Sequence, residues 1–112
     1  MKKSISLKLI VFSFLLVVSN LTYSTPVFQA GTGTNSTVAG VNNIATGDRS
    51  SAVGTNNEAK GDFSSAVGFS NTVSGNSSST FGVENIVTGN YSTAVGYKNK
   101  VTGDNSTALG TG

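Results

Sequence analysis

Glycine recurs at every seventh residue from Gly33 to Gly110, which places twelve glycines in one fixed register. The full repeat is fourteen residues long. Its units begin at Ser36, Ser50, Ser64, Ser78 and Ser92, and a half unit begins at Ser106. We number the positions of each unit from this first Ser. Any fold proposed for the chain must therefore repeat with this period, each unit stacking on its neighbours.

The repeat excludes a coiled coil and a collagen helix. A heptad coiled coil needs bulky apolar residues at two of its seven positions, whereas the fixed residue here is Gly, which costs about 1 kcal/mol per site in a helix. Collagen needs Gly at every third residue. Each half unit instead reads Ser/Asn-x-Ala/Val-x-Gly, and this two-residue alternation before a polar linker predicts a short strand and a turn.

Two strands and two turns in fourteen residues predict an all-β fold, a parallel β-roll (β-solenoid) of 14-residue coils. Gly is expected at each bend, because it adopts a positive φ without steric cost. The predicted turn glycines are Gly40, Gly47, Gly54, Gly61, Gly68, Gly75, Gly82, Gly89, Gly96, Gly103 and Gly110.

Charge decides which side chains face the interior. Position ten is always Ala or Val, and its neighbours at nine and eleven include Glu58, Lys60 and Lys100. Charges do not enter a dry interior unpaired, so position ten is expected inside, and position three as well by the symmetry of the half units. Position eight, always Asn, is expected to form a buried column with amide-to-amide hydrogen bonds; alternatively, each Asn caps only its own turn.

Position four then faces outward as an apolar stripe, to which position six adds Val41, Phe69, Val83 and Tyr97. An isolated monomer should avoid such a stripe, and about 88 residues with a core of Ala and Val are few for a stable monomer. A symmetric oligomer would bury it. The alternative exchanges the faces and puts position four inside. The position-four residues are Ala39, Val53, Val67, Phe81, Val95 and Leu109.

The first residues read as an export signal. Lys2, Lys3 and Lys8 precede an apolar run from Leu9 to Val18, which is about right for a signal peptide and too short to span a bilayer. Small residues favour cleavage after Ser24, with a weaker site after Ala30, and the alternative is an N-terminal anchor helix. The expected organisation is a signal peptide over residues 1–24, a lead-in over 25–35 and repeats over 36–112.

Composition argues against an enzyme and against cofactors. The chain has no His and no Cys, which excludes imidazole bases, thiolate nucleophiles, disulfides and the usual zinc sites. From residue 25 onward four basic residues stand against five acidic ones, a net charge of −1 that leaves no basic patch for nucleic acid. Asp48, Asp62 and Asp104 are too widely spaced for a calcium repeat and are expected to cap turns.

Three short segments carry a family resemblance. Residues 92–97 (Ser-Thr-Ala-Val-Gly-Tyr), 50–54 and 64–68 (both Ser-Ser-Ala-Val-Gly) resemble the head repeats of trimeric autotransporter adhesins, the YadA-like or Hep/Hag repeats. The resemblance covers residues 36–112. It implies a left-handed β-roll, a homotrimer, display on the surface of Gram-negative bacteria, and adhesion to host matrix or cells. It also makes Val53, Val67, Phe81, Val95 and Leu109 the candidate trimer interface.

The resemblance leaves alternatives for function. Members of the family continue into a stalk and a membrane-anchor barrel, which are not found before Gly112, so a truncated or fragmentary member is expected; without an anchor it would be secreted or periplasmic. A structural spacer that lifts another domain is the main alternative. A column with Thr46, Thr88 and Thr102 suggests an ice-binding solenoid, but Lys60 and Ser74 interrupt it.

Overall fold

The computed structural model describes residues 28–112, and every regular element in that range is a strand. The predicted signal peptide and the first three residues of the lead-in (25–27) lie outside the described residues. The strands are β1 (Phe28–Ala30), β2 (Thr37–Val41), β3 (Ile44–Ala45), β4 (Ser51–Thr55), β5 (Glu58–Ala59), β6 (Ser65–Phe69), β7 (Thr72–Val73), β8 (Ser79–Val83), β9 (Ile86–Val87), β10 (Thr93–Tyr97), β11 (Lys100–Val101) and β12 (Thr107–Thr111).

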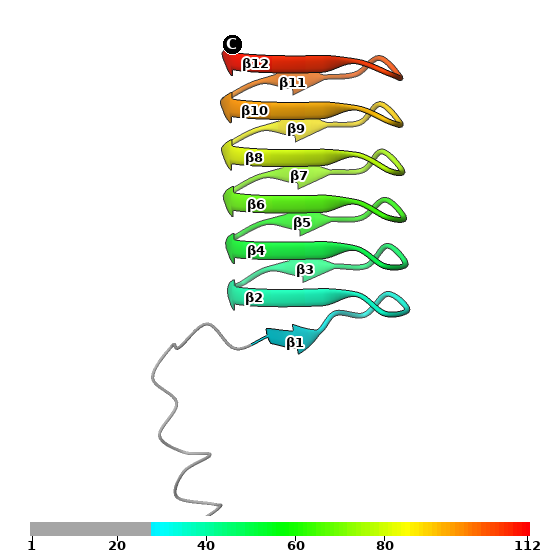
Figure 1. Cartoon of the computed structure of the whole chain (residues 1–112). Helices are drawn as coiled ribbons and strands as arrows, with labels where there is room; N and C mark the ends of the chain where they lie inside the picture. The colour runs from blue at the N-terminus through cyan, green and yellow to red at the C-terminus, as the bar shows by residue number, and fades with distance from the viewer. Residues whose placement is uncertain (1–27) are drawn as a thin grey trace, which may run out of the picture.

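Each full coil consists of one five-residue strand, one two-residue strand and the two turns between them (Figure 1). The long strands form a sheet in the order β1-β2-β4-β6-β8-β10-β12, and the short strands form a second sheet in the order β11-β9-β7-β5-β3. Successive coils pair in parallel with a shift of one unit, so that Val67 lies opposite Phe81. The predicted all-β solenoid of 14-residue coils is confirmed; its left hand stays a prediction of the resemblance.

The N-terminal edge of the long sheet is closed by β1. This strand pairs with β2 in the antiparallel direction, whereas β2 through β12 are parallel to one another, and Phe28 lies opposite Ala39. In Figure 1, β1 lies directly beneath the first coil, next to β2. The first three residues of β2, Thr37 to Ala39, are therefore paired on both sides, with β1 on one edge and β4 on the other.

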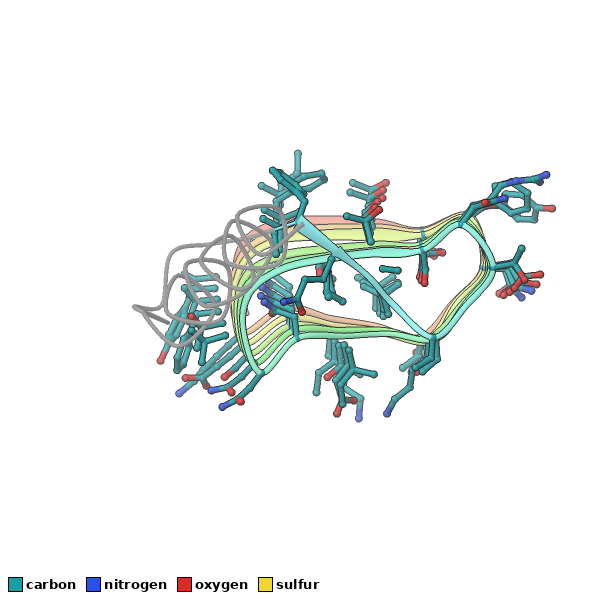
Figure 2. All side chains as sticks on the ribbon, turned by 90° about the horizontal axis from the view of Figure 1, so that it is seen from below. Carbon is teal, nitrogen blue, oxygen red and sulfur yellow. The ribbon has the colours of Figure 1, made fainter. Side chains whose placement is uncertain are left out.

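Small residues fill the narrow interior between the two sheets. Positions three and ten point inward, as predicted: Ala52, Ala66 and Ala94 from the long strands and Val73 and Val87 from the short strands are fully buried. Seen along the rod, the coil is flattened, and only short side chains stand between the two layers (Figure 2). The alternative that places position four in the interior is wrong.

Position eight forms a ladder of buried Asn side chains through the rod. The Nδ2 of Asn71 donates to the Oδ1 of Asn57 at 2.9 Å, and the Oδ1 of Asn71 accepts from both the Nδ2 and the backbone N of Asn85 at 3.0 Å. The Nδ2 of Asn71 also donates to the backbone carbonyls of Val67 and Gly82. The predicted amide-to-amide column is confirmed, and each side chain ties its own turn to both neighbouring coils.

The glycines differ from the expectation that all of them lie in turns with positive φ. One column lies at the fourth residue of the long strands, with φ between 109° and 129°: Gly40, Gly54, Gly68, Gly82, Gly96 and Gly110. The other column does lie in turns, but without positive φ: Gly47, Gly61, Gly75, Gly89 and Gly103. The positive φ of the turns belongs to non-glycine residues at positions seven and fourteen, such as Ser70 and Phe63.

Close approach of the coils explains both columns of glycine. A Cβ on Gly68 would overlap the carbonyl oxygen of Gly82 in the next coil, and a Cβ on Gly75 would overlap that of Gly89. A side chain at either place would push the coils apart and break the sheet hydrogen bonds beside it. Glycine therefore recurs every seven residues because the backbones of stacked coils approach too closely for a side chain at two places in each coil.

Replacing Asn71 with Ala should lower the free energy of unfolding by about 3 kcal/mol or more, because it leaves several buried donors and acceptors of both neighbouring coils unpaired. Urea unfolding followed by circular dichroism measures the loss. Thr72→Ala is the matched control, because Thr72 is the next residue and points outward from β7. An equal, small effect of the two substitutions would contradict the structural role of the ladder.

Thr80 interrupts the interior column of Ala and Val at position three. Its hydroxyl is buried and has no hydrogen-bond partner among the described residues. Thr80→Val keeps the shape and removes the unpaired oxygen, so it should raise the free energy of unfolding by about 1 kcal/mol. Thr72→Val, on the outward face, should change it by less than about 0.5 kcal/mol in the same assay. A loss of stability in Thr80→Val would contradict the absence of a partner.

Candidate interaction surface

The outward face of the long-strand sheet carries the apolar stripe predicted at position four. Val53, Val67, Phe81, Val95 and Leu109 follow one another in register across β4, β6, β8, β10 and β12. Phe81 is 45% exposed, Val95 37% and Leu109 74%, while Val53 and Val67 are half-buried. Ala39 extends the column into β2 but is buried, opposite Phe28 of β1. The stripe therefore runs from the second coil onward.

Position six widens the stripe at the end of four of the six long strands, while Thr55 in β4 and Thr111 in β12 occupy the same position. Val41, Phe69 and Tyr97 are exposed and Val83 is half-buried, and they lie in register across the same sheet. Figure 2 shows large side chains gathered along the outside of the long-strand layer and around the adjoining narrow end of the coil. In the coils that carry an apolar residue at position six, the apolar surface thus extends from the sheet to the turn that follows it.

A charged pair borders the stripe at position seven. The Nζ of Lys98 lies 3.6 Å from the Oε2 of Glu84 in the preceding coil and 4.9 Å from the ring centre of Tyr97. Hydrogen bonding to Tyr97 and the nearby carboxylate of Glu84 raise the pKa of Lys98 above its ordinary value. Lys98 therefore stays charged beside the apolar surface at neutral pH, as expected for the rim of a contact surface rather than its centre.

Position thirteen forms a second ladder, at the turn that precedes each long strand. The Oδ1 of Asp62 accepts from the backbone N of Asp48 at 2.9 Å, and the Oδ1 of Asn76 accepts from the backbone N of Asp62 at 2.9 Å. Asn90 and Asp104 continue the series. Turn capping by the acidic residues is confirmed, with the refinement that each side chain caps the turn of the preceding coil.

Sequence reasoning missed the ridge at position fourteen. Phe63 and Tyr91 are 54% and 68% exposed at the tips of these turns, and the guanidinium of Arg49 lies 5.1 Å from the ring centre of Phe63. All three residues have positive φ. The repeat pattern hides this ridge because position fourteen varies from unit to unit, so nothing in the periodicity singles it out.

Among residues 28–112, no group of three or more acidic, His or Cys side chains is arranged to hold a metal ion. The same range contains no helix long and apolar enough to cross a membrane.

The stacked coils, the two glycine columns and the outward apolar stripe define a repetitive β-solenoid module whose long-strand sheet carries an exposed apolar surface. The family model of the YadA head domain repeat (2 copies) matches residues 32–57, 59–82 and 88–112. The chain therefore belongs to the YadA head domain repeat family, which is a family of structural adhesin modules found in the heads of trimeric autotransporters. A search of curated proteins gave no match.

Proposed function

We propose that this chain is the adhesive head of a surface-displayed homotrimer, in which the apolar stripe forms the contact between protomers and the remaining surfaces meet the host matrix or host cells. The observation that carries the proposal is the continuous stripe on one sheet of a module whose own core holds only small residues. The family match supports the adhesin class, and the details of assembly, display and ligand are the proposal.

The case for assembly rests on burial. The interior is made mostly of Ala and Val, whereas the largest apolar side chains, such as Phe81 and Leu109, lie outside it. The stripe runs along the rod from the second coil onward and repeats once per coil, so an oligomer whose axis is parallel to the rod buries every copy at once. The number three comes from the family, since the stripe alone requires only a symmetric partner.

Replacing both Val67 and Val95 with Asp should break this assembly, because two unpaired charges per chain would be placed at the proposed interface, at a cost of several kcal/mol for each trimer. Thr72→Asp, on the outward face of the other sheet, should leave a trimer. Analytical ultracentrifugation of the wild type and both variants measures the change. A wild type that is a folded monomer at micromolar concentration contradicts the proposed interface.

The adhesive function predicts that the purified chain binds immobilised collagen, fibronectin or laminin. Many weak contacts from repeated coils would add up by avidity, so the trimer should bind more tightly than the Val67→Asp/Val95→Asp variant. Surface plasmon resonance on the three matrix proteins measures both. A trimer that binds none of these proteins and no host cell would favour the spacer, in which the same rod only carries another module.

A further inference from the structure

We propose that the aromatic residues of the ridge at position fourteen pack against the aromatic residues at position six of the neighbouring protomer. Phe63 of one chain meets Phe69 of the next, and Tyr91 meets Tyr97. This inference rests on the proposed homotrimer and adds to it a contact outside the apolar stripe. The contact fixes the direction and the register in which the chains associate.

The aromatic residues of the two positions flank the same long strands. Phe63 lies just before β6 and Phe69 ends it, while Tyr91 lies just before β10 and Tyr97 ends it. At the four other long strands neither position is aromatic, since position fourteen is Asn, Arg or Ser and position six is Val or Thr. The two rings at one strand are also of the same kind, Phe with Phe and Tyr with Tyr. The ridge therefore varies together with position six.

The two members of each pair cannot touch within one chain. Phe69 follows Phe63 by six residues, which is about 20 Å of extended strand. The turns that contain position fourteen and those that follow position six lie at opposite narrow ends of the flattened coil (Figure 2). Packing inside a coil therefore does not explain why the two rings occur together, whereas a contact between chains does.

A cyclic assembly around an axis parallel to the rod brings the two ends together. Rotation about such an axis keeps every coil at its own height, and it sets one end of each long strand beside the opposite end of the same strand in the next chain. Phe63 is then level with Phe69 of its neighbour, and Tyr91 is level with Tyr97. A shift of one coil would place each ridge ring level with a Val or Thr at position six instead. Both like pairs form only when the chains are parallel and in register.

The apolar stripe lies between the two proposed contacts. Val67 comes four residues after Phe63 and two residues before Phe69, so it lies about 13 Å from the first and about 7 Å from the second along the strand. All the rings of the two pairs are exposed in the single chain, by 43% at Tyr97 and 68% at Tyr91 at the extremes. A neighbour that covers the stripe therefore also reaches the borders of the sheet, where these rings stand.

The ring of Phe63 presents its edge to a neighbouring chain. Arg49 belongs to the preceding coil, and its guanidinium lies over the ring, 5.1 Å from the ring centre. The face of the ring is thus directed along the rod, and its edge is directed away from the turn. Aromatic pairs favour edge-to-face and offset arrangements, because the edge of a ring is positive and its face negative. Phe69 of the neighbour supplies a second ring at the same height.

Backbone strain adds a reason for the contact. Phe63 and Tyr91 have φ of 56° and 54°, a left-handed conformation that is uncommon for bulky residues and costs stability. Asn35 and Asn105, which tolerate this conformation better, occupy the same position at the first and last long strands. Burial of the two aromatic rings against a neighbouring chain offsets the cost.

Disulfide formation tests the pairing, because the natural chain contains no Cys. We expect the purified Phe63→Cys/Phe69→Cys variant, oxidised at micromolar concentration, to form covalently closed trimers in a denaturing gel without reductant. The two thiols of one chain are about 20 Å apart, which is too far for an internal disulfide. Val41→Cys/Phe63→Cys is the matched control, because its thiols differ in height by two coils, about 10 Å. It should give at least about tenfold less product, and equal yields from the two variants would overturn the register.

Analytical ultracentrifugation of the same proteins separates this inference from the proposed assembly. A Phe63→Cys/Phe69→Cys variant that sediments as a trimer but forms no disulfide overturns the ridge contact and leaves the trimer intact. A wild type that sediments as a folded monomer overturns both, because the ridge then has no neighbouring chain.

A double-mutant cycle tests the second pair without cysteine. Tyr91→Asn and Tyr97→Thr introduce residues that other coils already carry at these positions, so both variants should fold. Each should raise the concentration at which half of the trimer dissociates about tenfold. Residues that contact each other are not additive, so the double variant should also show about tenfold, against the roughly hundredfold of independent sites. Ile86→Ala, at an exposed position of β9 in the other sheet, is the control and should leave the trimer unchanged. Additive effects of the two Tyr substitutions would refute the contact.

Discussion

Stacking of one backbone directly on the next is the constraint on which this structure depends. The coils approach so closely at two lines that only hydrogen fits in place of a side chain, as at Gly68 and Gly75. Because the coils stack this closely, the strands form parallel ladders of backbone hydrogen bonds. The Asn amides at position eight also come within hydrogen-bond distance of one another. The interior is left thin, and Ala and Val suffice to fill it.

A thin interior determines where the large apolar residues go. Phe81, Leu109 and Tyr97 do not fit between the sheets and lie on the outer face, where they form a stripe that an isolated chain leaves in water. In a globular domain such residues would form the core. Here hydrogen bonds and backbone stacking stabilise the coil, and the large apolar side chains remain exposed for contact with other molecules.

Periodicity predicted the fold and the inward columns, because a charge such as Lys60 beside Ala59 allows only one orientation of the strand. It failed where a residue type has two uses. The sequence placed both Gly68 and Gly75 in turns with positive φ, yet Gly68 lies within β6 with a positive φ and no room for a Cβ, and Gly75 lies in a turn without a positive φ and also has no room for a Cβ. A sequence does not show which of these two requirements a Gly meets. The ridge of Phe63 and Tyr91 was missed for the opposite reason, since it depends on how the units differ rather than on what they share.

The in-register columns also set a rule for how such a gene can change in length. Insertion of fourteen residues between two coils adds one coil and leaves every ladder of hydrogen bonds intact. Insertion of seven keeps the spacing of the glycines but brings a long strand over a short one, so the Asn ladder would meet the Ser of position one. The antiparallel β1 closes one end, where Phe28 already lies opposite Ala39. Lengthening by whole fourteen-residue coils within the array is therefore compatible with every ladder, whereas a new coil at the edge of β2 would have to displace β1.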